Sequence, residues 1–118
     1  MQSAQELIVT RPTYQAAGCL VVPVREIVDI ANAARVRGDL TTVIRRCTPL
    51  RVVVDLHAAV LTRAGVEVLE AAHAVAVEDG KRLRVSARHP LAREVLRITG
   101  ADLLLLVHAD LPAALNAP

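Results

Sequence analysis

Three residues whose side chains could do chemistry follow one another at the end of an apolar segment. Asp55 and His57 stand two residues apart where the segment RVVVDL (51–56) ends, and Thr62 follows shortly after. Side chains two residues apart on a strand point the same way, so the pair has the arrangement of a general acid and base. With the Thr62 hydroxyl as a nucleophile, a hydrolase is one hypothesis for this chain.

Other sequence features expected of an enzyme are missing. The chain has no Gly-x-Ser-x-Gly elbow and no glycine-rich phosphate loop, and His73, His89 and His108 are too scattered for a ligand set. Cys19 and Cys47 are too few and too far apart for a zinc site, and we interpret both as small core residues. We therefore expect no enzymatic activity, no metal and no cofactor.

Length and composition restrict the remaining classes of protein. The 118 residues suit one domain, 1–118, in which we expect residues 1–5 to be flexible. A hydrophobic content of 53% excludes a disordered chain, and no apolar run reaches the ~18 residues of a membrane span. No signal peptide is recognisable at the start of the chain. We expect a cytoplasmic protein without membrane insertion.

The charge pattern argues against a nucleic-acid partner. The formal net charge is only +2, and acidic and basic residues are interspersed along the chain. Nucleic-acid binding favours a clustered basic surface with stacking aromatic residues, whereas Tyr14 is the only aromatic residue here. Arg35, Arg37, Arg45 and Arg46 do cluster, but their spacing fits the solvated face of one helix.

The hydrophobic pattern alternates between strands and helices. We expect a turn at residues 12–18, and Pro23 places its strand at a sheet edge or bulge because proline cannot donate to the ladder. The predicted strands are 6–10, 19–24, 51–56, 82–87 and 103–107. The predicted helices run from a cap at Asn32 to Pro49, from Arg63 to Val77, from Pro90 to Gly100, and onward from a cap at Asp110.

This order predicts an α/β fold with a small mixed β-sheet and helices packed on it. Strands that alternate with helices run parallel and are joined by right-handed crossovers, whereas the first two strands can form an antiparallel hairpin. Continuous apolar strands need cover on both faces. We therefore expect the side chains of residues 52–54 and 104–106 to be buried.

Four segments, taken in order, resemble one known family. EIVDIANA (26–33) is similar to the stretch that precedes the first helix in that family, with Asp29 at the family's aspartate. VVVDL (52–56) and AGVEVLEAA (64–72) resemble its central strand and the following helix. REVLRITGADLLLLVHADLPAAL (93–115) resembles its ending. The family is that of the STAS domain, which includes the bacterial anti-sigma factor antagonists.

The junction before the central helix departs from the pattern of this family. STAS antagonists usually read Asp-Ser-x-Gly there, and a cognate anti-sigma kinase phosphorylates the serine to switch partner binding. Counted back from Gly65, Thr62 takes the aspartate position and Arg63 the serine position; counted forward from Asp55, Arg63 replaces the aspartate and Ala64 the serine. Neither count leaves a hydroxyl at the acceptor position. We interpret Thr62 as a helix N-cap, with a shifted phosphoacceptor as the alternative.

The resemblance implies a non-enzymatic regulatory module that docks on a protein partner. That partner is an anti-sigma factor with a kinase-like fold, in a bacterial partner-switching system that controls transcription. The alternative is a scaffolding, sensory or transporter-accessory protein that binds another STAS protein or a small apolar ligand, and a homodimer is compatible with either. The expected docking face comprises Asp29, Asn32, His57, Thr62, Arg63, Ala64, Gly65 and Glu67.

Overall fold

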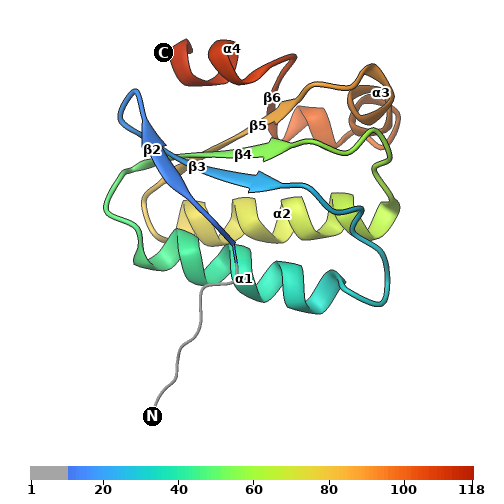
Figure 1. The fold of residues 1–118 in the computed structure, drawn as a ribbon, viewed down its shortest axis with the longest axis horizontal. Coiled ribbons are helices and arrows are strands. Elements are labelled where there is room, and N and C mark those ends of the chain that lie inside the picture. Colours follow the sequence, from blue (N-terminus) through green and yellow to red (C-terminus); the bar gives the residue numbers. More distant parts are fainter. Residues whose placement is uncertain (1–10) are drawn as a thin grey trace.

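The strands lie side by side in one mixed sheet, in the order β2-β3-β4-β5-β6. The computed structural model describes residues 11–118 (Figure 1), so the predicted strand at 6–10 and the predicted flexible residues 1–5 lie outside the described residues. β2 runs antiparallel to β3, and β3 to β6 run parallel to one another. The strands are β2 (Tyr14–Ala16), β3 (Cys19–Val24), β4 (Arg51–Leu56), β5 (Arg82–Ala87) and β6 (Leu106–His108).

Helices follow the parallel strands and cover both faces of the sheet. α1 and α2 lie on one face, and α4 lies on the other (Figure 1). Between residues 11 and 118, no helix is long and apolar enough to cross a membrane. The helices are α1 (Ala33–Arg46), α2 (Arg63–Glu78), α3 (Pro90–Ile98) and α4 (Leu111–Asn116), with a 3-10 turn, η1, at Ala101–Leu103.

The central strand β4 supplies side chains to both faces of the sheet. Val52 and Val54 enter the main core with the apolar faces of α1 and α2. Val53 points the other way and packs with Cys19 and Ala114. All three valines are fully buried, as the sequence predicts for an apolar strand that is covered on both faces.

Most predicted elements are confirmed. The strands at 19–24, 51–56 and 82–87 begin and end where the apolar runs do. The Asp110 side chain accepts a hydrogen bond from the Ala113 N–H at 2.8 Å and caps α4 as predicted. Gly100 follows α3 in the left-handed conformation, with φ of 78°, which is the usual helix-ending role of glycine. The predicted α/β fold with a mixed sheet is therefore correct.

The first hairpin differs from the prediction. The segment 12–18, predicted to be a turn, contains strand β2, and the turn itself consists of Ala17 and Gly18, with φ of 52° and 76°. Two successive positive φ values suit the twist of a tight antiparallel hairpin. The Arg51 guanidinium donates to the Ala17 carbonyl at 2.7 Å. Alanine rarely adopts positive φ, so the sequence carried no usual signal for so short a turn.

Pro23 lies in β3 between two other strands, so its predicted place at a sheet edge or bulge is wrong. Proline is tolerated there because β2 is short. Within the described chain β2 pairs only with residues 19–21 of β3, so Pro23 has a ladder neighbour on the β4 side alone, opposite Asp55.

The last strand is shorter than predicted. Leu103 ends η1, and β6 begins only at Leu106, at the edge of the sheet. Leu105 is fully buried, but Leu104 and Leu106 are 48% and 52% exposed, so the prediction that both are buried is wrong. An edge strand has a neighbour on one side only, and a run of identical leucines does not mark where a strand begins.

A buried lysine ties the end of α1 to the turn that follows α2. Lys81 Nζ donates to the carbonyl oxygens of Ile44 and Cys47 and pairs with Asp79 at 2.8 Å. The last carbonyls of a helix lack partners within it, so this ammonium satisfies groups at the end of α1. The hydrogen bond from Asp79 raises the pKa of Lys81, although burial opposes that shift.

Replacing Lys81 tests this tie. Lys81→Met should lower the free energy of unfolding by about 2 kcal/mol, because it leaves the Ile44 and Cys47 carbonyls without their donor. The matched control Arg82→Met removes a neighbouring exposed cation and should change stability by less than about 0.5 kcal/mol. Denaturant unfolding at neutral pH measures both. Because the pKa of Lys81 is raised, its contribution is fully present below the ordinary value of 10.5 and declines above it. Equal effects of the two substitutions would contradict the tie.

Candidate functional site at the carboxyl edge of the sheet

The loops that follow β3, β4 and β5 meet at one edge of the sheet. They comprise residues 25–32, 57–62 and 88–89. Parallel strands bring their carboxyl ends to the same edge, which is where open α/β sheets commonly bind ligands or partners. All the predicted site residues lie in the first two loops or in the opening turns of α2.

Thr62 joins two of these loops at the start of α2. It occupies the N-cap position, and its hydroxyl accepts a hydrogen bond from the Gly65 N–H at 3.0 Å, as predicted for a cap. The same hydroxyl donates to the carbonyl oxygen of Val28 in the loop after β3. Gly65 fits closely here, because a Cβ at this position would lie 2.9 Å from the end of the Leu61 side chain, which would have to move.

Asp29 and Asn32 shape the loop that precedes α1. The Asn32 side chain accepts from the Asp29 N–H at 2.8 Å, and the Asp29 carboxylate accepts from the Asn32 N–H at 2.9 Å. Asn32 does occupy the N-cap position, but its side chain makes no capping hydrogen bond, so that part of the prediction is wrong. The Asn32 side-chain amide bonds instead to Asp29 and, at 3.0 Å, to the Ile27 carbonyl. These local hydrogen bonds replace the capping bond to α1.

The predicted Asp55–His57 pair forms, and a third residue joins it. His57 Nε2 lies 3.0 Å from Asp55 Oδ2, and an Arg88 nitrogen donates to the same oxygen at 3.0 Å. Asp55 is 1% exposed, so the arginine compensates a carboxylate that burial alone would destabilise. Sequence reasoning missed Arg88. Its signal was the strand register, because Leu56 pairs with Ala87 and so sets Arg88 level with His57.

Two further polar side chains line up with Asp55 across the sheet. Asp55 pairs in register with Ser86, and Ser86 with His108, on the sheet face that carries α4. Within residues 11–118 the buried Ser86 hydroxyl and His108 Nε2 have no hydrogen-bond partner. Burial and the charge of Arg84 lower the pKa of His108. The row resembles a catalytic set in composition only, because a fully buried serine is closed to substrate.

Arg63, Ala64 and Glu67 lie in the first turns of α2, and the two charged side chains are exposed. Arg63 is the first helical residue, and its side chain is 92% exposed. Its guanidinium lies 3.7 Å from the Glu67 carboxylate, one turn along the helix, and such exposed pairs contribute little to stability. A positive charge at a helix N-terminus is also disfavoured by the helix dipole, so stability does not explain Arg63.

Exposed apolar side chains lie on the same loops as these polar groups. Ile30 is 93% exposed and Ile27 46% exposed on the loop after β3, and Val60 is 52% exposed on the loop after β4. Sequence reasoning did not single them out. The sequence did contain a signal for them. They are large aliphatic residues in segments without the hydrophobic periodicity of a helix or a strand, so their burial could not be assumed.

An ion-pair network fixes the start of the loop 25–32. The buried Arg11 side chain contacts one carboxylate oxygen of Glu26 at 2.8 Å, and Arg35 of α1 contacts the other at 3.1 Å. The hydrogen bond from Arg11 lowers the pKa of Glu26 to about 2, although burial opposes that shift. Glu26 is therefore ionised at neutral pH and anchors the loop to α1.

Comparison with known proteins assigns the chain to a family. A model of the STAS domain matches residues 10–114, which is most of the chain. The chain belongs to the STAS domain family. The family prediction made from the sequence is thereby confirmed, and the loops described above are those of a STAS domain. No curated protein sequence matches this STAS domain significantly.

Solved structures with a similar fold include an anti-sigma factor antagonist from Mycobacterium paratuberculosis. Its crystal structure has a TM-score of 0.74 and 26% sequence identity to this STAS domain, with 90% of each chain covered. The protein TM1081, solved by NMR, has a TM-score of 0.75 and 10% identity, covering 97% of this chain and 90% of its own. A serine-to-glutamate variant of RsbS from Moorella thermoacetica has a TM-score of 0.70 and 19% identity, covering 91% and 92%. These last two show likeness of fold alone.

The Glu26 network makes a prediction about pH. Glu26→Gln should lower the free energy of unfolding by about 1 kcal/mol at neutral pH, a modest value because the carboxylate is partly exposed. Since the folded-state pKa lies below the ordinary 4.5, this contribution is present above pH 4.5 and is lost as pH falls through about 2. Urea unfolding over that range should show the two proteins converging. Glu78→Gln, at an exposed position, serves as the control, and a Glu26 difference independent of pH would contradict the network.

Thr62 makes a second prediction. Thr62→Val keeps the shape of the side chain but removes the hydroxyl, so the Gly65 N–H and the Val28 carbonyl lose their partner. We expect the free energy of unfolding to fall by about 1–2 kcal/mol. Thr62→Ser retains the hydroxyl and should change stability by less than about 0.5 kcal/mol. Thermal and urea unfolding compare the variants, and a loss in Thr62→Ser as large as that in Thr62→Val would contradict a dominant role of the hydroxyl.

Proposed function

We propose that this STAS domain is a non-enzymatic regulatory module that docks on an anti-sigma factor with a kinase-like fold. The docking face comprises the loops 25–32 and 57–62 and the first turns of α2. It contains every residue of the predicted site: Asp29, Asn32, His57, Thr62, Arg63, Ala64, Gly65 and Glu67.

The observation that carries the proposal is the group of exposed aliphatic side chains on this face. Ile30, Ile27 and Val60 project from two loops that the Thr62 hydroxyl joins. Folding gains nothing from an isoleucine that is 93% exposed, whereas a partner that covers it gains apolar burial. Exposed apolar groups rimmed by polar residues are typical of protein interaction sites.

The two loops suit recognition because internal contacts fix their shape. Asp29 and Asn32 bond reciprocally, Glu26 anchors the loop to α1, and Thr62 bonds to Val28. A surface that is already ordered loses less conformational entropy when a partner binds. The likeness to the mycobacterial anti-sigma factor antagonist, at 26% identity over 90% of each chain, supports an anti-sigma factor as that partner.

The same face carries no phosphorylation switch of the usual kind. The serine of the family motif stands at the start of the helix, and the first helical residue here is Arg63. This favours the count back from Gly65, in which Arg63 takes the serine position. The only hydroxyl nearby, on Thr62, is held between the Val28 carbonyl and the Gly65 N–H. We propose that partner binding is constitutive or governed by the amount of protein.

The hydrolase hypothesis receives little support from the geometry. A nucleophile must pass its proton to a general base, but the Thr62 hydroxyl donates to a backbone carbonyl instead. One carboxylate oxygen of Asp55 contacts both His57 and Arg88. This arrangement suits a structural link between the ends of two strands. The proposal therefore assigns Asp55 and His57 no catalytic role.

Binding and phosphorylation assays together test the proposal. Each anti-sigma factor encoded in the source genome is purified and titrated with the STAS domain by calorimetry. We expect one of them to bind, and Ile30→Asp to weaken that binding by about tenfold or more, as for a central apolar contact. Val77→Asp replaces another exposed aliphatic residue, in the last turn of α2, and should leave binding unchanged. Failure of every anti-sigma factor to bind would overturn the proposal.

The second arm incubates the domain with the binding anti-sigma kinase and ATP, followed by mass spectrometry of residues 51–82. We expect no phosphate on the wild-type protein and a phosphate on Arg63→Ser, which restores a hydroxyl at the helix N-terminus, where a phosphate is stabilised. Phosphate on Thr62 of the wild-type protein would show that the switch is shifted by one residue and still present.

A further inference from the structure

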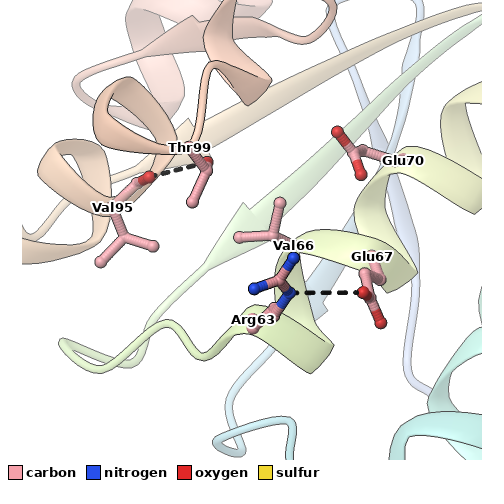
Figure 2. A pocket seen from close by; sticks show the side chains of 6 residues that line it. All are labelled: Arg63, Val66, Glu67, Glu70, Val95 and Thr99. Atoms are coloured by element: carbon pink, nitrogen blue, oxygen red, sulfur yellow. Dashed lines mark hydrogen bonds and ion pairs between the residues drawn. The ribbon is translucent and has the colours of Figure 1, made fainter.

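A groove lies between α2 and α3, beside the proposed docking face. Its volume is about 360 Å³, and it is lined by Arg63, Val66, Glu67, Glu70, Val95 and Thr99. Figure 2 shows Val66, Glu67 and Glu70 on the α2 side and Val95 and Thr99 on the α3 side. The two valines make its inner surface apolar, while the two glutamates place carboxylates along one wall.

Glu70 is the charged group in this groove that no residue between 11 and 118 compensates. It is half-buried, and no other described residue forms a hydrogen bond or ion pair with it. Glu67 pairs with Arg63 at 3.7 Å, and both side chains are exposed to solvent. Such a pair is weak, so Glu67 can readily pair with another cation instead. The Thr99 hydroxyl donates to the Val95 carbonyl of the preceding helix at 2.8 Å, so its proton is not available to Glu70. The groove thus presents two carboxylates spaced three residues apart on one helix face.

The outer face of α3 continues the apolar surface of the groove. Leu91, Val95 and Ile98 follow at the spacing that places side chains on one side of a helix. Leu91 and Ile98 are 61% and 68% exposed. Two large aliphatic side chains flanking a partly apolar groove indicate that its occupant also brings apolar residues beside its charge.

We propose that this groove receives an arginine side chain of the partner protein, within a short apolar segment. The aliphatic stem of the arginine packs on Val66 and Val95, as long basic side chains commonly do on apolar surfaces. Its planar guanidinium, which can bind carboxylates through several donors at once, contacts Glu70 and Glu67. Aliphatic residues on either side of the arginine cover Leu91 and Ile98.

This inference deepens the proposed function and rests on it, because Arg63 and Glu67 belong to both surfaces. The proposed function and the groove inference nevertheless make opposite predictions for the substitution of Arg63. At the docking face, Arg63→Ala removes a contact to the anti-sigma factor. In the groove, the same change frees Glu67 and removes a competing cation, so it strengthens binding of an arginine peptide.

The direct test uses a defined probe, the acetylated and amidated pentapeptide Ala-Leu-Arg-Leu-Ala. Titrated into the isotope-labelled full chain, it should shift the NMR amide signals of Val66, Glu70, Val95 and Thr99. The matched control peptide carries citrulline, which has nearly the shape of arginine without its charge. We expect it to bind at least about fivefold more weakly, the scale of one charge-assisted hydrogen bond in a partly exposed site.

Substitutions in the chain complete the design. Glu70→Gln should weaken peptide binding by about fivefold, whereas Glu78→Gln, at the exposed last residue of α2, should leave it unchanged. Equal binding of the two peptides, signal shifts away from the groove, or no effect of Glu70→Gln would overturn the inference. Shifts of the same signals with protein concentration alone would identify a second copy of the chain as the occupant and overturn it as well.

The outcome for the anti-sigma factor separates this inference from the proposed function. An anti-sigma factor whose affinity falls with both Ile30→Asp and Glu70→Gln supports both. One that responds to Ile30→Asp but not to Glu70→Gln leaves the proposed function standing and overturns the groove as part of its interface. If the peptide binds in the groove but no anti-sigma factor binds, the groove stands as an arginine site and the proposed function is overturned.

Discussion

Burial of the strand β4 on both faces organises the rest of this structure. Its valines are fully buried, and so is the Asp55 carboxylate near its end. A strand with no face toward water needs helices above and below and a strand on each side, and α1, α2, α4, β3 and β5 supply these. Parallel neighbours in turn need helical crossovers, so the loops after β3, β4 and β5 are brought to one edge.

Polar contacts at that edge hold the loops after β3, β4 and β5 in defined positions relative to one another. Asp55 holds His57 and Arg88, which come from two successive loops, and Thr62 holds Val28 from a third. Each contact gives a buried polar group a hydrogen-bond partner, which is the condition under which its burial is tolerated. The apolar side chains that remain outside this framework, Ile30 above all, are then free for another protein to cover.

The start of α2 carries a positive charge at Arg63. A phosphate there would meet free backbone N–H groups and the positive end of the helix, and would add negative charge to the proposed docking face. Arg63 places positive charge at that same position, against the preference of the helix. The carboxylates of Glu67 and Glu70 follow within two turns. The first two turns of α2 therefore carry charges of both signs, and in protein interfaces such charges favour partners of complementary charge.

The sequence by itself determined the strands at 19–24, 51–56 and 82–87, the helices between them, the STAS family and the cap at Thr62, because these depend on local periodicity, capping chemistry and order along the chain. It did not determine the short turn at Ala17–Gly18, the exposure of Leu104 and Leu106, or the turning back of Asn32 toward Asp29. Those features depend on which strand lies at an edge and on which of several competing hydrogen bonds is formed. Only the tertiary structure decided that Arg88 reaches Asp55, that Thr62 bonds to Val28, and that Glu70 has no partner within the described part of the chain. The first two contacts join residues 33 and 34 positions apart, and the third feature depends on what surrounds a side chain in space. No local pattern encodes either.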